Sequence, residues 1–356
     1  MHINEKNPIG LNGIEFVEFA SPAPAALHQL FLDFGFSRKM ENAGTNTDLY
    51  RQNNINFLLN KKESSFAGQF KKSHGPSICS MGWVVQDAHR AFDIARDRGA
   101  KAPLKGDYVT KNGVPVPCIY GIGDSLIYFV EEGAGLHFYQ DIGFTELSKP
   151  DLVSDKGFTE IDHLTNNVPY GTMKEWGDFY KNIFGFTEVR YFDIRGASTG
   201  LQSYALRSPC GRFCIPINEA TEKESQINEY LREYNGPGIQ HLAFLTDDIL
   251  TSLKGLEGTS ISTLDIDDEY YANVFNRVPN VVEDKLAIRK NNVLVDGDEN
   301  GYLLQIFTKN LVGPIFIEII QRKNHLSFGE GNFTALFRSI ERDQVKRGVI
   351  TNANAH

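Results

Sequence analysis

The chain has 356 residues, of which 41% are hydrophobic and 23% are charged, values typical of soluble globular proteins. At about 150 residues per domain, this length predicts two domains and is ample for a buried core. The 36 basic and 45 acidic residues give a formal net charge of −9, which disfavours nucleic acid as a partner. No apolar run approaches the roughly 18 residues that a membrane span needs, so we expect no membrane association.

The N-terminal residues and the cysteines indicate the cellular setting. The first 13 residues contain no basic segment followed by an apolar one, so we expect no signal peptide. The four cysteines form no Cys-x-x-Cys pair, and the Cys210/Cys214 pair has no second pair to complete a zinc site. We therefore expect reduced thiols in a cytoplasmic protein.

The two halves of the chain repeat one pattern of elements. The first half predicts, in chain order, a strand at 13–19, a helix at 25–33, a strand from 75, a helix at 88–98 and a strand at 126–131. The second half predicts the same series at 160–166, 173–183, from 236, 249–256 and 315–320. This repeat predicts a duplicated α+β fold, and the polar, glycine-rich stretch 131–156 suggests domains at 1–150 and 151–356.

A further element follows the repeat. Between residues 331 and 347, the apolar side chains recur at helical spacing, at Phe333, Leu336, Phe337 and Ile340. Asn332 precedes them and is a suitable N-cap residue. We therefore predict a C-terminal helix whose apolar face packs against the rest of the protein.

At three matched positions of the repeat, the second half has a side chain that can bind a metal where the first half has none. The aligned pairs, second half first, are His163 with Phe16, His241 with Ser80 and Glu318 with Phe129. Each residue alone has an ordinary explanation, since strand histidines are usually structural and a strand carboxylate can face solvent. Together, two histidines and one carboxylate on three strands match the ligand set of non-haem Fe(II) proteins.

The sequence around these residues resembles a known family. The most specific blocks are GIQHLA at 238–243, LLQIFT at 303–308, IFIEIIQR at 315–322 and FGEGNF at 328–333. In these blocks the chain resembles the 4-hydroxyphenylpyruvate dioxygenase family of the vicinal-oxygen-chelate superfamily. The resemblance covers nearly the whole chain and is densest from residue 157 to residue 347.

The resemblance implies a fold, a metal and a substrate pocket. It implies two domains of paired βαβββ modules, of which the C-terminal one forms an open barrel around Fe(II). It implies that the iron ligands are His163, His241 and Glu318. It carries over a substrate pocket made of Ser203, Asn218, Gln226, Gln240, Gln305, Phe307, Phe333 and Phe337. It further implies that a helix at about 332–347 gates the site and that the protein forms a homodimer or homotetramer.

Strand periodicity bears on two of these pocket positions. Gln305 and Phe307 alternate with Leu304 and Ile306, so they are expected to share one face of their strand. Gln240 directly precedes a predicted ligand, so its side chain is expected on the opposite face unless a bulge intervenes.

The reaction implied by the resemblance converts 4-hydroxyphenylpyruvate and dioxygen into homogentisate and CO2 in tyrosine catabolism. It proceeds by oxidative decarboxylation, ring hydroxylation and side-chain migration. Three alternatives stand beside this reaction: a 4-hydroxymandelate synthase, which hydroxylates the benzylic carbon, an extradiol catechol dioxygenase, and a non-catalytic binding protein on the same fold. Asn218 and the Phe333/Phe337 pair favour the homogentisate-forming branch, and the intact ligand set disfavours a binding protein.

Overall fold

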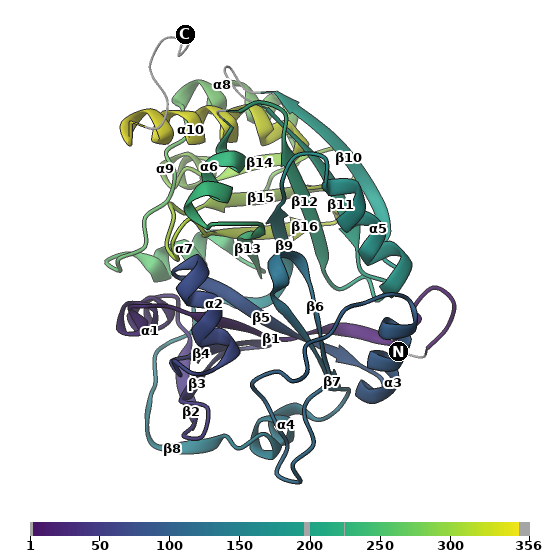
Figure 1. Cartoon of the computed structure of the whole chain (residues 1–356). Helices are drawn as coiled ribbons and strands as arrows, with labels where there is room; N and C mark the ends of the chain where they lie inside the picture. The colour runs from purple at the N-terminus through teal and green to yellow at the C-terminus, as the bar shows by residue number, and fades with distance from the viewer. Residues whose placement is uncertain (1–2, 196–199, 224, 349–356) are drawn as a thin grey trace.

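The computed structural model describes residues 3–195, 200–223 and 225–348. Its two eight-stranded sheets, one from each half of the chain, lie one above the other in Figure 1. The first sheet has the order β6-β7-β5-β1-β4-β3-β2-β8. Its strands are β1 Leu11–Ala20, β2 Ser37–Asn42, β3 Thr47–Gln52, β4 Ile55–Asn60, β5 Ser77–Val85, β6 Cys118–Tyr120, β7 Leu126–Glu131 and β8 Thr145–Asp151.

The second sheet has the order β10-β11-β12-β9-β13-β16-β15-β14. Its strands are β9 Phe158–Asn167, β10 Thr187–Arg195, β11 Gly200–Arg207, β12 Cys214–Ala220, β13 Gly238–Thr246, β14 Leu294–Gly297, β15 Tyr302–Phe307 and β16 Phe316–Lys323. The helices are α1 Pro24–Asp33, α2 Phe66–His74, α3 Ala88–Asp97, α4 Gly135–Asp141, α5 Met173–Phe184, α6 Gln226–Glu233, α7 Ile249–Leu256, α8 Asp268–Arg277, α9 Lys285–Lys290 and α10 Phe333–Lys346. Short 3₁₀ turns occur at Ile122–Asp124 and Glu330–Asn332.

The predicted duplication is confirmed by the strand pairing. β1 is parallel to β4 and antiparallel to β5, and β9 has the same relation to β12 and β13. The order β-α-β-β-β occurs in β1–β4 and in β9–β12. The unit β13–β16 has the same strands with three helices, α7 to α9, in place of one, and the unit from β5 to β7 has one strand fewer. Local signals repeat as well, because Asp87 and Asp248 cap the helices α3 and α7 by accepting a backbone N–H bond.

One expected alignment between the halves is wrong by a residue. In the second sheet, Ala243 lies opposite both His163 and Glu318. In the first sheet, Gly82 lies opposite both Phe16 and Tyr128. Glu318 therefore matches Tyr128, and not Phe129, whose side chain faces the other side of the sheet. The matches of His163 with Phe16 and of His241 with Ser80 are confirmed by the same register.

The stretch 131–156 is more structured than its composition indicates. It contains α4 and β8, and β8 joins the first sheet by pairing with β2. The chain then enters the second sheet at Phe158. The division into domains at 1–150 and 151–356 stays a prediction, which this change of sheet supports.

The two halves share a hydrophobic core. Phe36 stacks on Phe57 with ring centroids 4.3 Å apart, and Phe244 of the second half contacts both rings. Phe34 packs edge-on against the same Phe244 at 5.7 Å. Elsewhere between the two halves, Trp83 of the first packs edge-on against Phe184 of the second, with ring centroids 4.9 Å apart. Aromatic packing of this kind fixes the second sheet on the first.

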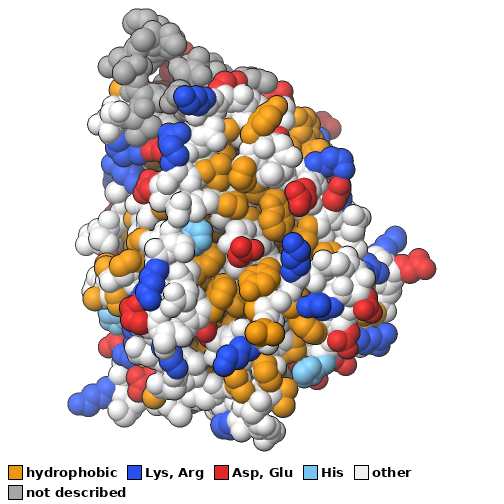
Figure 2. Space-filling view, in the orientation of Figure 1, with side chains coloured by type: hydrophobic (Ala, Val, Ile, Leu, Met, Phe, Trp, Pro, Cys, Tyr) orange, Lys and Arg blue, Asp and Glu red, His pale blue; other side chains and the backbone are white. Residues whose placement is uncertain are grey.

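The surface carries charged side chains of both signs as well as hydrophobic ones. Acidic and basic side chains are interspersed over the face in Figure 2, and hydrophobic side chains gather between them. Among the described residues, no helix combines the length and the apolar composition needed to cross a membrane.

Candidate functional site

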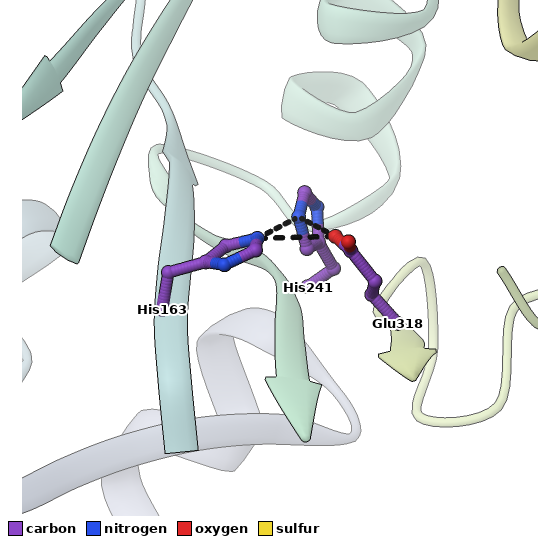
Figure 3. A group of neighbouring side chains, drawn as sticks. All are labelled: His163, His241 and Glu318. Carbon is purple, nitrogen blue, oxygen red and sulfur yellow. Dashed lines mark hydrogen bonds and ion pairs between the residues drawn. The ribbon is translucent and has the colours of Figure 1, made fainter. Parts of the chain in front are cut away.

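His163, His241 and Glu318 meet in the second half of the chain, as Figure 3 shows. They project from the neighbouring strands β9, β13 and β16. The Nε2 atom of His163 lies 3.0 Å from Glu318 Oε2 and 3.3 Å from His241 Nε2, and His241 Nε2 lies 3.4 Å from the same oxygen. All three side chains are buried. The prediction that these three side chains lie together is therefore confirmed.

The three side chains shift one another's pKa values. Burial raises the pKa of Glu318, but the charge of His163 and hydrogen bonds from both histidines lower it to about 2. Burial lowers the pKa of His163, but the charges of Glu318 and Asp162 and their hydrogen bonds raise it to about 9. Burial also lowers the pKa of His241. The carboxylate is therefore held ionised, in the form that binds a cation.

The donor set fits a divalent transition metal. The three ligand atoms lie within 4.8 Å of one another, and they are two imidazole nitrogens and one carboxylate oxygen. Imidazole and carboxylate ligands from three strands, with one side left open, are the arrangement typical of non-haem iron sites. Each histidine has its second nitrogen occupied by a neighbour, Asp162 for His163 and Gln240 for His241, as metal-binding histidines usually do. The chain thus has a buried His–His–Glu metal site.

A cavity lies directly beside this triad. Its wall includes all eight residues that the sequence predicts for the substrate, contributed by β11, β12, α6, β13, β15 and α10: Ser203, Asn218, Gln226, Gln240, Gln305, Phe307, Phe333 and Phe337. The structure therefore brings these side chains together around the triad. Their role in binding substrate stays a prediction.

The amide groups in and beside the cavity form two separate hydrogen-bonded groups. Ser203 and Asn218 lie opposite each other on β11 and β12. The Asn218 side-chain amide lies 3.5 Å from Gln240 Oε1 and 3.3 Å from Asn167 Oδ1. Gln305 is buried on β15, and Asn332 Nδ2 approaches its Oε1 at 3.4 Å. These groups offer polar contacts at fixed positions in an otherwise largely apolar wall.

Gln240 faces the cavity because of a β-bulge. Ile239 lies opposite Asn166 and His241 lies opposite Thr165, so Gln240 is an extra residue on β13. The bulge brings Gln240 and His241 to the same side of the sheet, and Gln240 Oε1 lies 3.1 Å from His241 Nδ1. The side chain of Gln240 therefore does not face away from the cavity, as it would in a regular strand. The reason is a β-bulge, the one exception that the strand pattern leaves open.

Aromatic side chains that the sequence analysis did not select complete the cavity. Phe192 on β10 packs edge-on against Phe333 at 5.1 Å, and Phe328 lies edge-on to His163 at 5.8 Å. Phe316 stacks on His241 at 4.8 Å. Phe328 and Phe316 lie in sequence blocks that carry the family resemblance, which is the signal that could have identified them. Phe192 has no such signal.

Helix α10 covers the cavity and is held at both ends by polar contacts. At its start, Asn332 occupies the N-cap position but its side chain makes no capping bond. The Asn332 oxygen accepts instead from Tyr270 OH at 2.6 Å, so the predicted capping role is wrong and the residue links α10 to α8. At its end, Gln344 donates to Glu229 of α6 at 2.7 Å, and Arg347 donates to the same carboxylate.

Comparison with known proteins places the chain in a family. The family model "Hydroxyphenylpyruvate dioxygenase, HPPD, N-terminal" matches residues 5–145, and that of the Glyoxalase/Bleomycin resistance protein/Dioxygenase superfamily matches residues 160–284. The protein MelA of Shewanella colwelliana is 58% identical over 98% of this chain and 99% of its own length. The 4-hydroxyphenylpyruvate dioxygenase of Pseudomonas aeruginosa is 44% identical over 98% of both chains.

A solved structure has the same fold. A mutant of 4-hydroxymandelate synthase from Streptomyces coelicolor superimposes with a TM-score of 0.79, covering 94% of this chain and 99% of its own. At 24% identity, this match concerns the fold alone. The full-length relatives, the duplicated fold and the His–His–Glu site agree, and we conclude that the chain belongs to the hydroxyphenylpyruvate dioxygenase family.

Proposed function

We propose that the protein is a 4-hydroxyphenylpyruvate dioxygenase. It converts 4-hydroxyphenylpyruvate and O2 into homogentisate and CO2, and the two electron pairs that reduce O2 come from the substrate. The observation that carries the proposal is the buried His163–His241–Glu318 triad beside a cavity of aromatic and amide side chains, in a chain with full-length relatives of that name.

We propose Fe(II) as the metal, held by His163 Nε2, His241 Nε2 and one carboxylate oxygen of Glu318. Bound there, Fe(II) would supply the Lewis-acid and redox chemistry that brings the keto acid and dioxygen together. The two ligand nitrogens face the cavity because the opposite nitrogens, both Nδ1, point at Asp162 and Gln240.

The remaining pocket residues bind and orient the substrate. Gln305, Gln240 and Asn218 provide amide donors for the carboxylate, keto and phenol oxygens, and Ser203 adds a hydroxyl group. Phe333 and Phe337 of α10 and Phe307 of β15 enclose the ring. Closing the site with these rings excludes water from the reacting atoms and so protects reactive intermediates. Gln226, the first residue of α6, lines this cavity and also a second one that includes Asp343 and Arg347 at the end of α10.

Four further features are proposed, the gating role and the oligomer on the family resemblance and the other two on the sequence. We propose a cytoplasmic location, two domains at 1–150 and 151–356, and a gating role for residues 332–347. We also propose that the protein forms a homodimer or homotetramer. Light scattering on the purified protein tests this, and a monomer at all concentrations would contradict it.

The first experiment is a product assay. Protein purified without oxygen is loaded with Fe(II), mixed with 4-hydroxyphenylpyruvate and air, and the aromatic product is identified by chromatography and mass. Homogentisate supports the proposal. Its isomer 4-hydroxymandelate would keep the iron and keto-acid chemistry but contradict the ring-hydroxylating outcome. Iron bound without oxygen uptake would point to a catechol substrate, and no bound iron would point to a binding protein.

A further inference from the structure

A β-bulge precedes the first histidine of the triad, as one precedes the second. Ile161 lies opposite Phe244 and His163 lies opposite Ala243, so Asp162 is an extra residue on β9. The bulge brings the Asp162 carboxylate onto the ring of the residue that follows it, where Oδ2 accepts from His163 Nδ1 at 2.7 Å. In a regular strand, Asp162 and His163 would point to opposite faces.

This contact fixes which nitrogen of His163 binds metal. An ionised carboxylate can only accept hydrogen bonds, so the proton of a neutral His163 ring stays on Nδ1. The lone pair is then on Nε2, the atom that lies 3.0 Å from Glu318 and 3.3 Å from His241. Asp162 therefore holds the Nδ1 side of the ring, so that Nε2 is the atom left to exchange its proton for a metal.

Arg322 on β16 holds Asp162 in place. Its Nε donates to Asp162 Oδ1 at 2.7 Å and its Nη2 donates to Asp162 Oδ2 at 2.8 Å. The two side chains are each only 13% exposed. A bidentate pair of this kind restricts the carboxylate to one orientation more strongly than a single bond does.

The same guanidinium reaches the segment that leads to α10. Arg322 Nη1 donates to the backbone oxygen of Ser327 at 2.6 Å and to that of His325 at 3.1 Å. The next residue, Phe328, places its ring edge-on to His163. A continuous set of contacts thus runs from the triad to Phe328, in the segment that precedes α10.

The first half of the chain shows that the bulge alone does not create this arrangement. There, Ile14 lies opposite Trp83 and Phe16 lies opposite Gly82, so Glu15 is the corresponding extra residue. Counting along the strand from Tyr128, the position that matches Arg322 is Glu132. Two acidic residues replace the Asp–Arg pair in the half that has no metal ligands. The pair is therefore associated with the metal site and not with the strand geometry.

We propose that Asp162 and Arg322 are positioning residues that set His163 as an Nε2 ligand and couple metal binding to the segment 325–328 and α10. The proposal rests on the proposed metal site. It predicts that metal binds more weakly when either partner is changed, and that bound metal orders this segment only when Arg322 is present.

The test measures metal affinity and backbone protection without turnover. Apo protein is titrated with Co(II) and, under argon, with Fe(II), in competition with a chelator. Asp162→Asn and Arg322→Gln should weaken binding by about 10- to 100-fold. The control is Asp48→Asn, which removes a buried partner of Arg38 and Lys61 in the first half and should bind Co(II) like the parent. Saturating Co(II) should slow amide exchange at 325–337 in the parent and control, but not in Arg322→Gln.

Contrary outcomes are distinguishable. Binding of Co(II) by both variants within twofold of the parent overturns the inference, provided that the parent loses binding on Glu318→Ala. A parent that binds no metal, or binds it equally without Glu318, overturns the proposed function itself. If Asp162→Asn does not fold by circular dichroism, Arg322→Lys replaces it. This variant keeps the positive charge but loses the planar guanidinium that donates two hydrogen bonds to Asp162. It should therefore bind Co(II) more weakly than the parent. An affinity equal to that of the parent counts against the proposal.

Discussion

Tyr128 and Glu318 occupy the same position in the two halves, because Tyr128 lies opposite Gly82 as Glu318 lies opposite Ala243. In the first half, aromatic rings fill the space that the triad occupies in the second, with Tyr128 6.0 Å from Phe16 and 5.4 Å from Tyr108. Both halves therefore keep the same strands, and among the residues that the structure describes only the second has a metal-ligand triad beside a cavity.

Removing one ligand should abolish metal binding while leaving the protein folded. His241→Ala and Glu318→Ala each take one of three ligand atoms from a buried site, and two remaining ligands do not retain iron against a chelator. We expect no detectable iron after desalting and no turnover, with an unchanged circular dichroism spectrum. Ser203→Ala, which lines the cavity without touching the triad, is the control that keeps its iron. Near-normal turnover in either ligand variant would disprove the metal assignment.

Deleting the chain from Asn332 onward should uncouple oxygen consumption from product formation, or stop turnover. The deletion removes Phe333 and Phe337 from the cavity wall and so admits water to the reacting atoms. An oxygen electrode and homogentisate quantification on the same sample give the ratio. Arg347→Ala, which loses contacts to Glu229 and Asp343 at the far end of α10 but removes no side chain from the cavity wall, should stay closer to the parent. An unchanged ratio after the deletion would contradict the gating role.

Gly329→Ala should weaken substrate binding by displacing Gln305. Gly329 has a φ of +77°, and an added Cβ would lie 2.0 Å from Gln305 Oε1, so the amide has to leave its position. We expect kcat/KM to fall by about tenfold or more, in line with loss of a hydrogen bond of about 1.5 kcal/mol. Gly348→Ala is a matched control, because its φ is +75° but no atom lies within 4 Å of the added Cβ. Equal kinetics for the two variants would exclude Gln305 from substrate binding.

Glu18 should make stability decrease as the pH rises from about 4.5 to about 7. Burial and the charge of Asp107 raise the pKa of Glu18 to about 7, against hydrogen bonds from Ser80, Tyr108 and Asn60 that lower it. The folded protein therefore retains a proton that the unfolded chain releases above pH 4.5, so rising pH favours unfolding until the folded carboxyl also ionises.

Glu18→Gln removes this titration and tests its sign. Urea unfolding at pH 5 and pH 8 should show a variant that gains stability relative to the parent at the higher pH. The exposed substitution Glu146→Gln should leave the difference between the two pH values as it is in the parent. A Glu18→Gln variant that loses stability relative to the parent at pH 8 would reverse the sign and contradict the raised pKa.

The elements with strong periodicity were predictable from the sequence, and so was the triad. α7 has the predicted bounds, Ile249–Leu256, and α10 begins one residue after the predicted start at about 332 and ends one before the predicted end at 347. His163 and His241 could be found because a duplicated chain provides its own comparison. Glu318 was found as a carboxylate in an apolar strand, although its partner in the repeat was misaligned by one residue.

The β-bulges and long-range contacts that shape the site could not be predicted from the sequence. Strand alternation assumes regular pairing, so it assigns Gln240 and Asp162 to the wrong face, and only the register of β9 and β13 reveals the bulges. Similarly, Asn332 has the composition of an N-cap, but Tyr270 and Gln305 bind its side chain from elements distant in sequence. β8 was missed because its exposed residues gain order only from pairing with β2.

The aromatic core shared by the two sheets explains why the half without metal ligands is retained. Phe244 follows the ligand His241 by three residues on β13, and its ring rests on Phe34, Phe36 and Phe57 of the first half. If the catalytic half were produced alone, this face of β13 would be exposed to water as an apolar patch. The first half thus acts as an intramolecular scaffold, and heat should unfold both halves in one transition.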